Sequence, residues 1–277
     1  MNAVDPQDVL TRTAALPEVV VRYDARADAL VDLHVPPGNS PHPLIVLVHG
    51  GFWKQGYDRV HIRPMARALV DEGCVVAAME YRRVAPGPAA GSGGPGGPGG
   101  LGGPGGGWPT TGLDVEAALT ALPDLLDGLG IETTTMTLTG HSAGGHLVLW
   151  LAARGHAAGT RVVALAPVAD LRAAAADRLG DGATQALLGG EPDEVPESYA
   201  AADPMTLLGA DTPGEIVLMH GSDDDVVPPS QSRALAAAHP QVELREPDGV
   251  GHLEVIDPLS AAWPAVLDLL VGTRTRG

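Results

Sequence analysis

Two patterns of apolar residues predict the strands near the amino end of the chain. Residues 18–23 and 29–35 alternate apolar and polar side chains, as half-buried strands do, and we expect both to be antiparallel. Residues 44–48 and 74–79 are continuous apolar runs rich in valine. Runs of this kind are typical of strands that are buried on both faces of a sheet.

Apolar residues at helical spacing alternate with further short strands. Residues 113–129 show this spacing, with Asp114 and Glu116 near the start, where the helix dipole favours acids. Other helices are predicted at 58–71, 143–154, 229–239 and 258–271, and other strands at 133–139, 162–166, 216–219 and 242–245. Alternation of strands and helices predicts an α/β fold, with a mostly parallel central sheet covered by helices on both faces. The pattern breaks into short pieces over 168–214, which we interpret as a small cap or lid.

One segment is neither helix nor strand. Residues 87–107 contain 13 glycines and 4 prolines in 21 positions, too few side chains to form a core. A linker between two domains is the alternative, but the segments before and after it share one alternating pattern. We therefore expect a flexible loop insertion in a single domain that spans residues 1–277.

Charge and cysteine content exclude several classes of protein. The formal net charge is −17, and so strong an acidity argues against nucleic acid or an anionic membrane as partner. The single cysteine, Cys74, excludes an internal disulfide and any cysteine-rich metal site. We see no secretory signal and no apolar run of membrane-spanning length, so we expect a cytoplasmic protein. No H-E-x-x-H pattern or phosphate-binding loop is present, and we expect neither a metal nor a cofactor.

The sequence Gly-His-Ser-Ala-Gly at 140–144 predicts a nucleophile. It follows the predicted strand 133–139 and opens the predicted helix 143–154. A serine on so sharp a turn takes a strained backbone angle, so the residues two before and two after it must be very small. The alternative is a serine that only caps a glycine-rich helix start. We favour Ser142 as a catalytic nucleophile.

A nucleophilic serine needs a base and an acid that orients the base. In this type of fold they follow the serine in the order acid, then histidine. Asp223, Asp224 and Asp225 directly follow the strand 216–219, and His252 lies beyond the strand 242–245. A solvated turn or a weak cation site is the alternative for the aspartates, and a solvent-exposed loop histidine is the alternative for His252.

The sequence His-Gly-Gly-Phe-Trp at 49–53 predicts an oxyanion hole. Consecutive glycines after the strand 44–48 let backbone N–H groups turn toward a developing oxyanion, and Ala143 is expected to supply another N–H group. An ordinary glycine turn is the alternative. Aromatic residues make up only 3% of the chain, and we name Trp53 and Trp108 as tentative substrate-binding residues.

The other histidines give weaker signals. His141 is expected to point away from the nucleophile into the packing of the turn. His146 is expected to pack on its helix. His61 follows the oxyanion loop and either shapes the pocket entrance or, as we favour, lies on a helix face with salt bridges.

Together these motifs resemble the α/β-hydrolase superfamily, and within it the group of kynurenine formamidases (arylformamidases) and small carboxylesterases. The resemblance rests on residues 49–53, 140–147, 220–228 and 251–252. It implies Ser142 as nucleophile, Asp224 as acid, His252 as base, and an oxyanion hole from the backbone of Gly51, Phe52 and Ala143.

The resemblance thus predicts a serine hydrolase that cleaves a small carboxylic ester or an N-formyl or aryl amide through an acyl-enzyme. The expected partner is therefore a small acyl ester or amide. A peptidase of the prolyl-oligopeptidase type and a non-catalytic binding protein on the same fold are the alternatives.

Overall fold

A computed structural model describes residues 5–38, 41–85 and 105–272 of the chain. Most of the predicted loop insertion 87–107 lies outside the described residues. The described strands form one sheet in the order β1-β2-β4-β3-β5-β6-β7-β8. Their bounds are β1 Val19–Arg22, β2 Leu30–His34, β3 His42–Val48, β4 Val75–Met79, β5 Thr133–His141, β6 Arg161–Leu165, β7 Glu215–Met219 and β8 Val242–Arg245.

The register of the sheet confirms the two strand types expected from the apolar patterns. β2 runs antiparallel to both β1 and β4, whereas β3 to β8 are parallel. The carboxyl ends of the parallel strands therefore meet at one edge of the sheet, where the loops that carry the three motifs begin.

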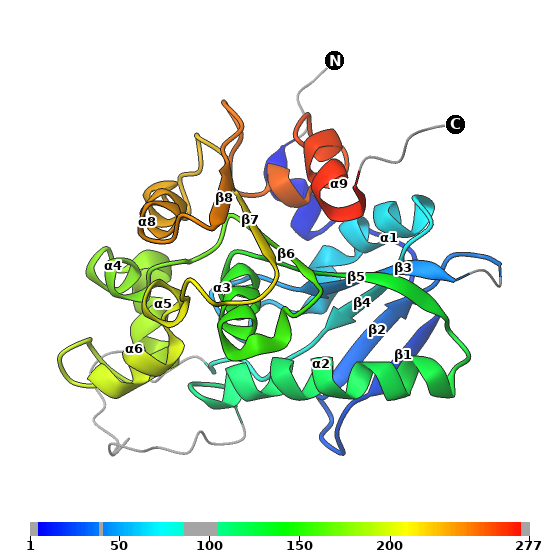
Figure 1. Cartoon of the computed structure of the whole chain (residues 1–277), viewed down its shortest axis with the longest axis horizontal. Coiled ribbons are helices and arrows are strands. Elements are labelled where there is room, and N and C mark those ends of the chain that lie inside the picture. Colours follow the sequence, from blue (N-terminus) through cyan, green and yellow to red (C-terminus); the bar gives the residue numbers. More distant parts are fainter. Residues whose placement is uncertain (1–4, 39–40, 86–104, 273–277) are drawn as a thin grey trace.

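Helices cover both faces of this sheet (Figure 1). Alternate residues of each buried strand point to opposite faces, so Val46 joins one core and Ile45 the other. The first core is closed by α2 Thr110–Gly128, α3 Ala143–Leu151 and α8 Ser230–Ala238. The second is closed by α1 Arg63–Asp71 and α9 Trp263–Val271, with the short helices η1 Pro6–Leu10 and η4 Glu254–Ile256.

Predicted and observed helix ends differ by one to three residues at α2 and α8, and three other predicted helices differ in ways that the sequence explains only afterwards. The helix expected at 58–71 is a 3-10 turn, η2 Arg59–Ile62, followed by α1, and the helix expected at 258–271 begins only at Trp263. Pro64 and Pro264 lie at the starts of these helices, where proline has no hydrogen bond to lose. The helix expected at 143–154 leaves α geometry after Leu151 and continues as a π-type segment, η3 Ala152–His156.

The region interpreted as a cap holds four short helices between β6 and β7. They are α4 Leu171–Ala176, α5 Leu179–Leu188, α6 Pro196–Ala202 and α7 Pro204–Leu207. They pack against the first core through residues such as Leu171, Leu187 and Tyr199. At the start of α5, four residues have left-handed backbone angles, namely Arg178, Gly180, Asp181 and Gly182.

Asp203, between α6 and α7, is a buried carboxylate of this region. Its Oδ1 accepts backbone N–H groups of Leu171 (3.1 Å) and Met205 (3.2 Å), and its Oδ2 has no partner among the described residues. Burial raises the pKa of Asp203 to about 6, even though these two N–H groups act in the opposite direction. An aspartate whose pKa is raised by folding stabilises the fold below its unfolded pKa and loses that stabilisation as pH rises through the folded value.

Replacement of Asp203 by asparagine is therefore expected to become more favourable as pH rises. Asparagine keeps an acceptor oxygen and does not ionise. We expect the free energy of unfolding of Asp203→Asn, relative to the wild type, to increase by about 2 kcal/mol between pH 4 and pH 7.5. Urea unfolding at both pH values measures this difference. The exposed Asp211→Asn is the control, and a difference for Asp203→Asn that does not change with pH would contradict the expectation.

None of the helices in the described ranges combines the length and the hydropathy that a bilayer span requires.

Candidate active site

Ser142 lies on the sharp turn between β5 and α3. Its backbone angles are φ 56° and ψ −117°, a strained conformation for a residue with a side chain. A Cβ atom at Gly140 would lie 2.3 Å from the Gly144 carbonyl oxygen, and one at Gly144 would lie 2.1 Å from that of Val48. The motif thus has glycine where a side chain would collide with backbone. Ser142 Oγ is buried and has no hydrogen-bond partner in the described chain.

Asp224 is the member of the aspartate run that contacts His252. Its Oδ2 lies 2.6 Å from His252 Nδ1, and its Oδ1 accepts the backbone N–H groups of Val226 (2.9 Å) and Val227 (2.8 Å). Burial alone would raise the pKa of Asp224, but the hydrogen bonds from His220 and His252 hold that pKa well below its usual range. Asp223 and Asp225 are exposed. Asp224 therefore faces His252 as a carboxylate.

The segment after β3 passes directly beside Ser142. A Cβ atom at Gly50 would lie 3.1 Å from Ser142 Cβ. Gly51, Phe52 and Trp53 all have positive φ angles, of 104°, 50° and 55°. The backbone N–H groups of Gly51 and Phe52 donate to no other described residue, and that of Ala143 begins α3, where helical N–H groups have no helical partner.

A cavity of about 140 Å³ opens at this junction and reaches both Ser142 and His252. It is smaller than the roughly 300–1,000 Å³ of sites for drug-sized ligands. Its lining consists of Gln7, Leu10, Gly51, Phe52, Tyr57, His61, His141, Ser142, Val226, His252 and Leu253. A larger hollow of about 490 Å³ at the amino ends of β5 to β7 contains none of the predicted site residues.

Two further histidines line this cavity, and both lie in environments that disfavour a charge. Burial, reinforced by the nearby His49, lowers the pKa of His61 to about 4. Burial and the neighbouring His252 lower the pKa of His141 well below its usual range. His141 Nε2 lies 2.9 Å from the His252 carbonyl oxygen and donates to it. Of these three imidazoles, only that of His252 is hydrogen-bonded to a carboxylate within the described structure.

The structure corrects the expectation for His141 and for both tryptophans. His141 does not point away from the site, because its ring lies 4.5 Å from that of His252, between centroids. Trp53 is fully buried and packs edge-on against His146 instead of lining the cavity. Trp108 packs at right angles against Trp150, with 5.0 Å between ring centroids, and does not line the cavity either. The bulk of both indoles completes the first core.

Residues near the start of the chain form a wall that the sequence did not predict. Gln7 and Leu10 on η1 line the cavity, while Val9 of the same helix is buried in the second core. Arg12 binds the buried Asp257 through both terminal nitrogens, which ties this segment to the loop that carries His252. The helix-start signal at Asp5 and Pro6 could have predicted η1, but no pattern indicated its position at the site.

No group of three or more histidine, cysteine, aspartate or glutamate side chains that could hold a metal ion occurs in the described ranges.

Comparison with known proteins finds similar esterases. The BD-FAE family matches residues 106–238, somewhat less than half of the chain. Esterase LipC of Mycobacterium tuberculosis (strain ATCC 25618 / H37Rv) is 25% identical over 234 residues, which are 77% of this chain and 53% of LipC. Esterase LipQ of the same organism is 26% identical over 226 residues, or 76% of this chain and 49% of LipQ. The chain thus spans about half the length of these curated relatives.

A solved structure shows the same fold. Esterase B from Lactobacillus rhamnosis (HN001) superposes with a TM-score of 0.68 at 22% identity, over 95% of this chain and 86% of that protein. Its similarity in structure agrees with the mostly parallel sheet of eight strands and the helices on both of its faces. The chain thus has the α/β-hydrolase fold, and the relatives that it resembles in sequence are esterases.

Proposed function

We propose that this chain is a serine esterase in which Ser142 is the nucleophile, His252 the base and Asp224 the orienting acid. Ser142 Oγ attacks the ester carbonyl while His252 takes its proton. The same proton passes to the departing alcohol, and water then cleaves the acyl-enzyme by the same route. The observation that carries the proposal is the 2.6 Å contact of Asp224 with His252 Nδ1 at a cavity that also contains Ser142.

The tetrahedral intermediate of this reaction needs donors for its oxyanion. We assign them to the backbone N–H groups of Gly51, Phe52 and Ala143. Two observations support the assignment: the glycine loop lies against Ser142, and the N–H groups of Gly51 and Phe52 have no partner in the described chain. Ala143 also lies at the positive end of the dipole of α3.

The cavity supports a short acyl group. A cavity of about 140 Å³ is comparable to the roughly 150 Å³ that holds one benzene molecule. Apolar walls come from Leu10, Phe52, Val226 and Leu253. We therefore propose acyl groups of roughly two to four carbons. A formyl group is smaller still and also fits the cavity, so an N-formyl aryl amide remains the second candidate substrate.

Rates on p-nitrophenyl acetate, an N-formyl aryl amide and an aminoacyl anilide test the proposed function. We expect kcat/KM to be highest for the acetate ester. A preference for the anilide would favour a peptidase, and no turnover of any of the three would favour a binding protein on this fold.

The leucine on η1 is expected to limit acyl chain length. Leu10→Ala removes part of the cavity wall, so longer chains gain space that the wild type denies them. We expect the ratio of kcat/KM for p-nitrophenyl hexanoate to that for p-nitrophenyl acetate to rise about tenfold, the lower end of the effect of one methylene group in an apolar pocket. Leu16→Ala in the same segment is the control, because Leu16 is 71% exposed. An unchanged ratio in Leu10→Ala would remove η1 from the specificity pocket.

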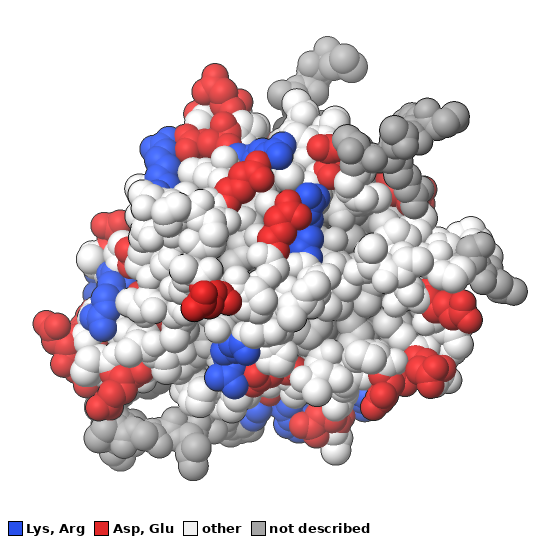
Figure 2. All heavy atoms as spheres, viewed as in Figure 1, with Lys and Arg blue, Asp and Glu red and all other residues white. Residues whose placement is uncertain are grey.

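The surface charge supports a small substrate over an anionic polymer. Acidic side chains are spread over the face viewed in Figure 2, and the basic ones shown there lie beside them. With a net charge of −17, this distribution offers no attraction for nucleic acid.

A further inference from the structure

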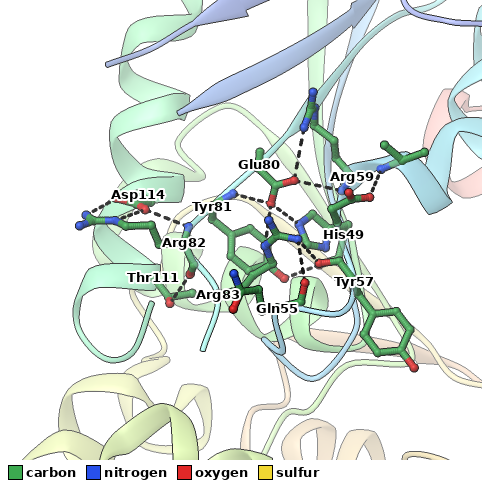
Figure 3. Close-up of polar contacts among 12 residues, drawn as sticks. His49, Gln55, Tyr57, Arg59, Glu80, Tyr81, Arg82, Arg83, Thr111 and Asp114 are labelled. Atoms are coloured by element: carbon green, nitrogen blue, oxygen red, sulfur yellow. Dashed lines mark hydrogen bonds and ion pairs between the residues drawn. The ribbon is translucent and has the colours of Figure 1, made fainter. Parts of the chain in front are cut away.

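Glu80 is a buried carboxylate outside the three catalytic positions, and it lies directly after β4 (Figure 3). It is 2% exposed. Its Oε1 lies 2.9 Å from His49 Nε2 and accepts the backbone N–H of Tyr81 at 3.1 Å. Its Oε2 accepts the backbone N–H of Arg59 at 3.3 Å. Two guanidinium groups also contact the carboxylate: Arg59 Nη1 lies 3.4 Å from Oε2, and Arg83 Nε lies 3.3 Å from Oε1. None of these contacts belongs to the proposed triad, yet His49 is the first residue of the oxyanion motif.

Both ring nitrogens of His49 face oxygens that can only accept. Nδ1 lies 2.8 Å from the Gly50 carbonyl oxygen, and Nε2 faces the Glu80 carboxylate. A neutral imidazole has one N–H group and would leave one of these contacts without a proton. The ring is fully buried and stacks on Tyr81, with 4.3 Å between centroids and 9° between planes, so it cannot exchange these contacts for water. The hydrogen bonds therefore require the imidazolium form.

The Glu80 side chain is suited to hold that charge. Burial tends to raise the pKa of Glu80, but His49, together with the charge of Arg83 and the hydrogen bond from the Tyr81 N–H, outweighs burial and lowers the pKa to about 2. Glu80 is thus a carboxylate that faces a cation in a site that excludes water.

The contact with Gly50 determines where the next N–H group points. The carbonyl of Gly50 and the N–H of Gly51 belong to one planar peptide and point in opposite directions. When His49 holds this carbonyl, the Gly51 N–H is directed away from His49 and is left unbonded in the described chain. The following peptide is held similarly, because the Gly51 carbonyl accepts the N–H of Lys54 at 2.9 Å.

We propose that Glu80 and His49 are positioning residues that act as a buried ion pair and hold the Gly50–Gly51 peptide so that the Gly51 N–H group faces the oxyanion. The pair touches neither the substrate nor Ser142 and acts only through this peptide. The inference rests on the proposed function, since it assigns a cause to the orientation of one of its oxyanion donors.

The course of the loop does not depend on Glu80 alone. Arg83 Nη1 donates to the Tyr57 carbonyl oxygen (Figure 3). The N–H of Gln55 donates to the Val84 carbonyl oxygen at 3.0 Å. Arg59 Nε donates to the buried Asp32 at 2.7 Å. These bonds hold the far end of the loop. Arg59 and Arg83 also contact Glu80 itself. Their bonds to Asp32 and to the Tyr57 carbonyl oxygen do not involve Glu80. Loss of the Glu80 charge is therefore expected to release the Gly50–Gly51 peptide and not the whole loop.

The variant Glu80→Gln tests the pair by kinetics. Without the carboxylate, His49 has no reason to keep its second proton, and the Gly50 carbonyl loses its donor. We expect kcat for p-nitrophenyl acetate to fall on the order of 10²-fold, as for small misplacements of catalytic groups, while KM stays within about threefold. The loss should be much smaller for the matching thionoester, because sulfur accepts hydrogen bonds weakly and gains less from the oxyanion hole in the wild type.

Asp114→Asn is the matched control. Asp114 is likewise 2% exposed and accepts two arginines, Arg26 and Arg82, but the oxyanion loop makes no hydrogen bond to it. We expect Asp114→Asn to lower the melting temperature and to leave the ester-to-thionoester ratio unchanged. Glu80→Asp keeps the charge and is expected to recover part of kcat. If Glu80→Gln does not fold, Glu80→Asp takes its place as the test variant.

Proton NMR of the wild type tests the same pair without any activity. The proposal predicts two slowly exchanging ring N–H protons for His49, of which Glu80→Gln retains one. A single ring N–H proton in the wild type would overturn the proposal. So would a Glu80→Gln enzyme whose ester and thionoester rates fall equally. An inactive wild type that shows both protons would overturn the proposed esterase function and leave the ion pair established.

Discussion

Replacement of Ser142 by alanine is expected to lower kcat for p-nitrophenyl acetate by a factor on the order of 10⁶, the loss that follows removal of a triad serine. The oxygen of the Ser142 hydroxyl is the attacking atom, and His252 activates it by accepting its proton. No other described group in the cavity is placed to act as the nucleophile. The fold should not change, because Ser142 Oγ makes no hydrogen bond in the described chain. Steady-state rates and a thermal melt of the same preparation measure both effects.

Ser230→Ala is the matched control for this experiment. Ser230 is exposed at the start of α8 and lies outside the cavity. It should retain wild-type activity. Retention of more than a tenth of wild-type activity in Ser142→Ala would contradict the mechanism.

Replacement of Asp224 by asparagine is expected to lower kcat by a factor on the order of 10⁴. The carboxylate accepts a hydrogen bond from the N–H of His252 Nδ1, so that Nε2 is free to accept the proton of Ser142. An amide at this position can present an N–H group to Nδ1, which favours the wrong tautomer. The low pKa of Asp224 also implies that the native carboxylate is ionised at neutral pH.

The two neighbouring aspartates are controls that the chain itself supplies. Asp223 and Asp225 are exposed and make no contact with His252 in the described structure. Asp223→Asn and Asp225→Asn are expected to change kcat less than tenfold. A dead Asp223→Asn enzyme with an active Asp224→Asn enzyme would show that a different carboxylate orients His252.

The parallel strands could be predicted because each is a short segment of apolar or β-branched residues, unbroken or alternating with polar ones, that lies between turns. Residues 242–245 match β8 in both bounds, and residues 44–48 lie within β3. Helix ends were less predictable. The sequence of α3 stays apolar through Ala152 and Ala153, yet Gly155 adopts a left-handed conformation that no α-helix accommodates. The backbone at a single glycine thus decided where the helix departs from its periodic pattern.

Most of the candidate site could be predicted because its residues follow strand ends that meet at one edge of the sheet. The choice of Asp224 came from resemblance, since three adjacent aspartates have the same chemistry and differ only in the direction of their side chains. The orientation of Trp53 was not predictable for a related reason. Its position in the motif predicted that it lies near the site. In the structure the backbone φ of Trp53 is 55°, and its side chain is buried in the first core.

Contacts between distant segments were the least accessible to sequence reasoning. Leu10 reaches the cavity through tertiary packing of η1 on the second core. Glu80 and His49 are 31 residues apart, and no sequence pattern links them. They meet because β3 and β4 are parallel neighbours, so that the residues after Val48 and after Met79 leave the sheet side by side. A correct strand order would have been needed to see this pair.

Labelling with a fluorophosphonate tests the central claim most directly, because the reagent bonds only to a serine whose proton is removed by a nearby base. Intact-mass measurement and peptide mapping of the wild type should find one phosphonyl group, on Ser142. Ser142→Ala should remain unmodified, and Asp224→Asn should react far more slowly. A folded wild-type protein that does not react, or that is labelled on another residue while Ser142 stays free, would contradict the account.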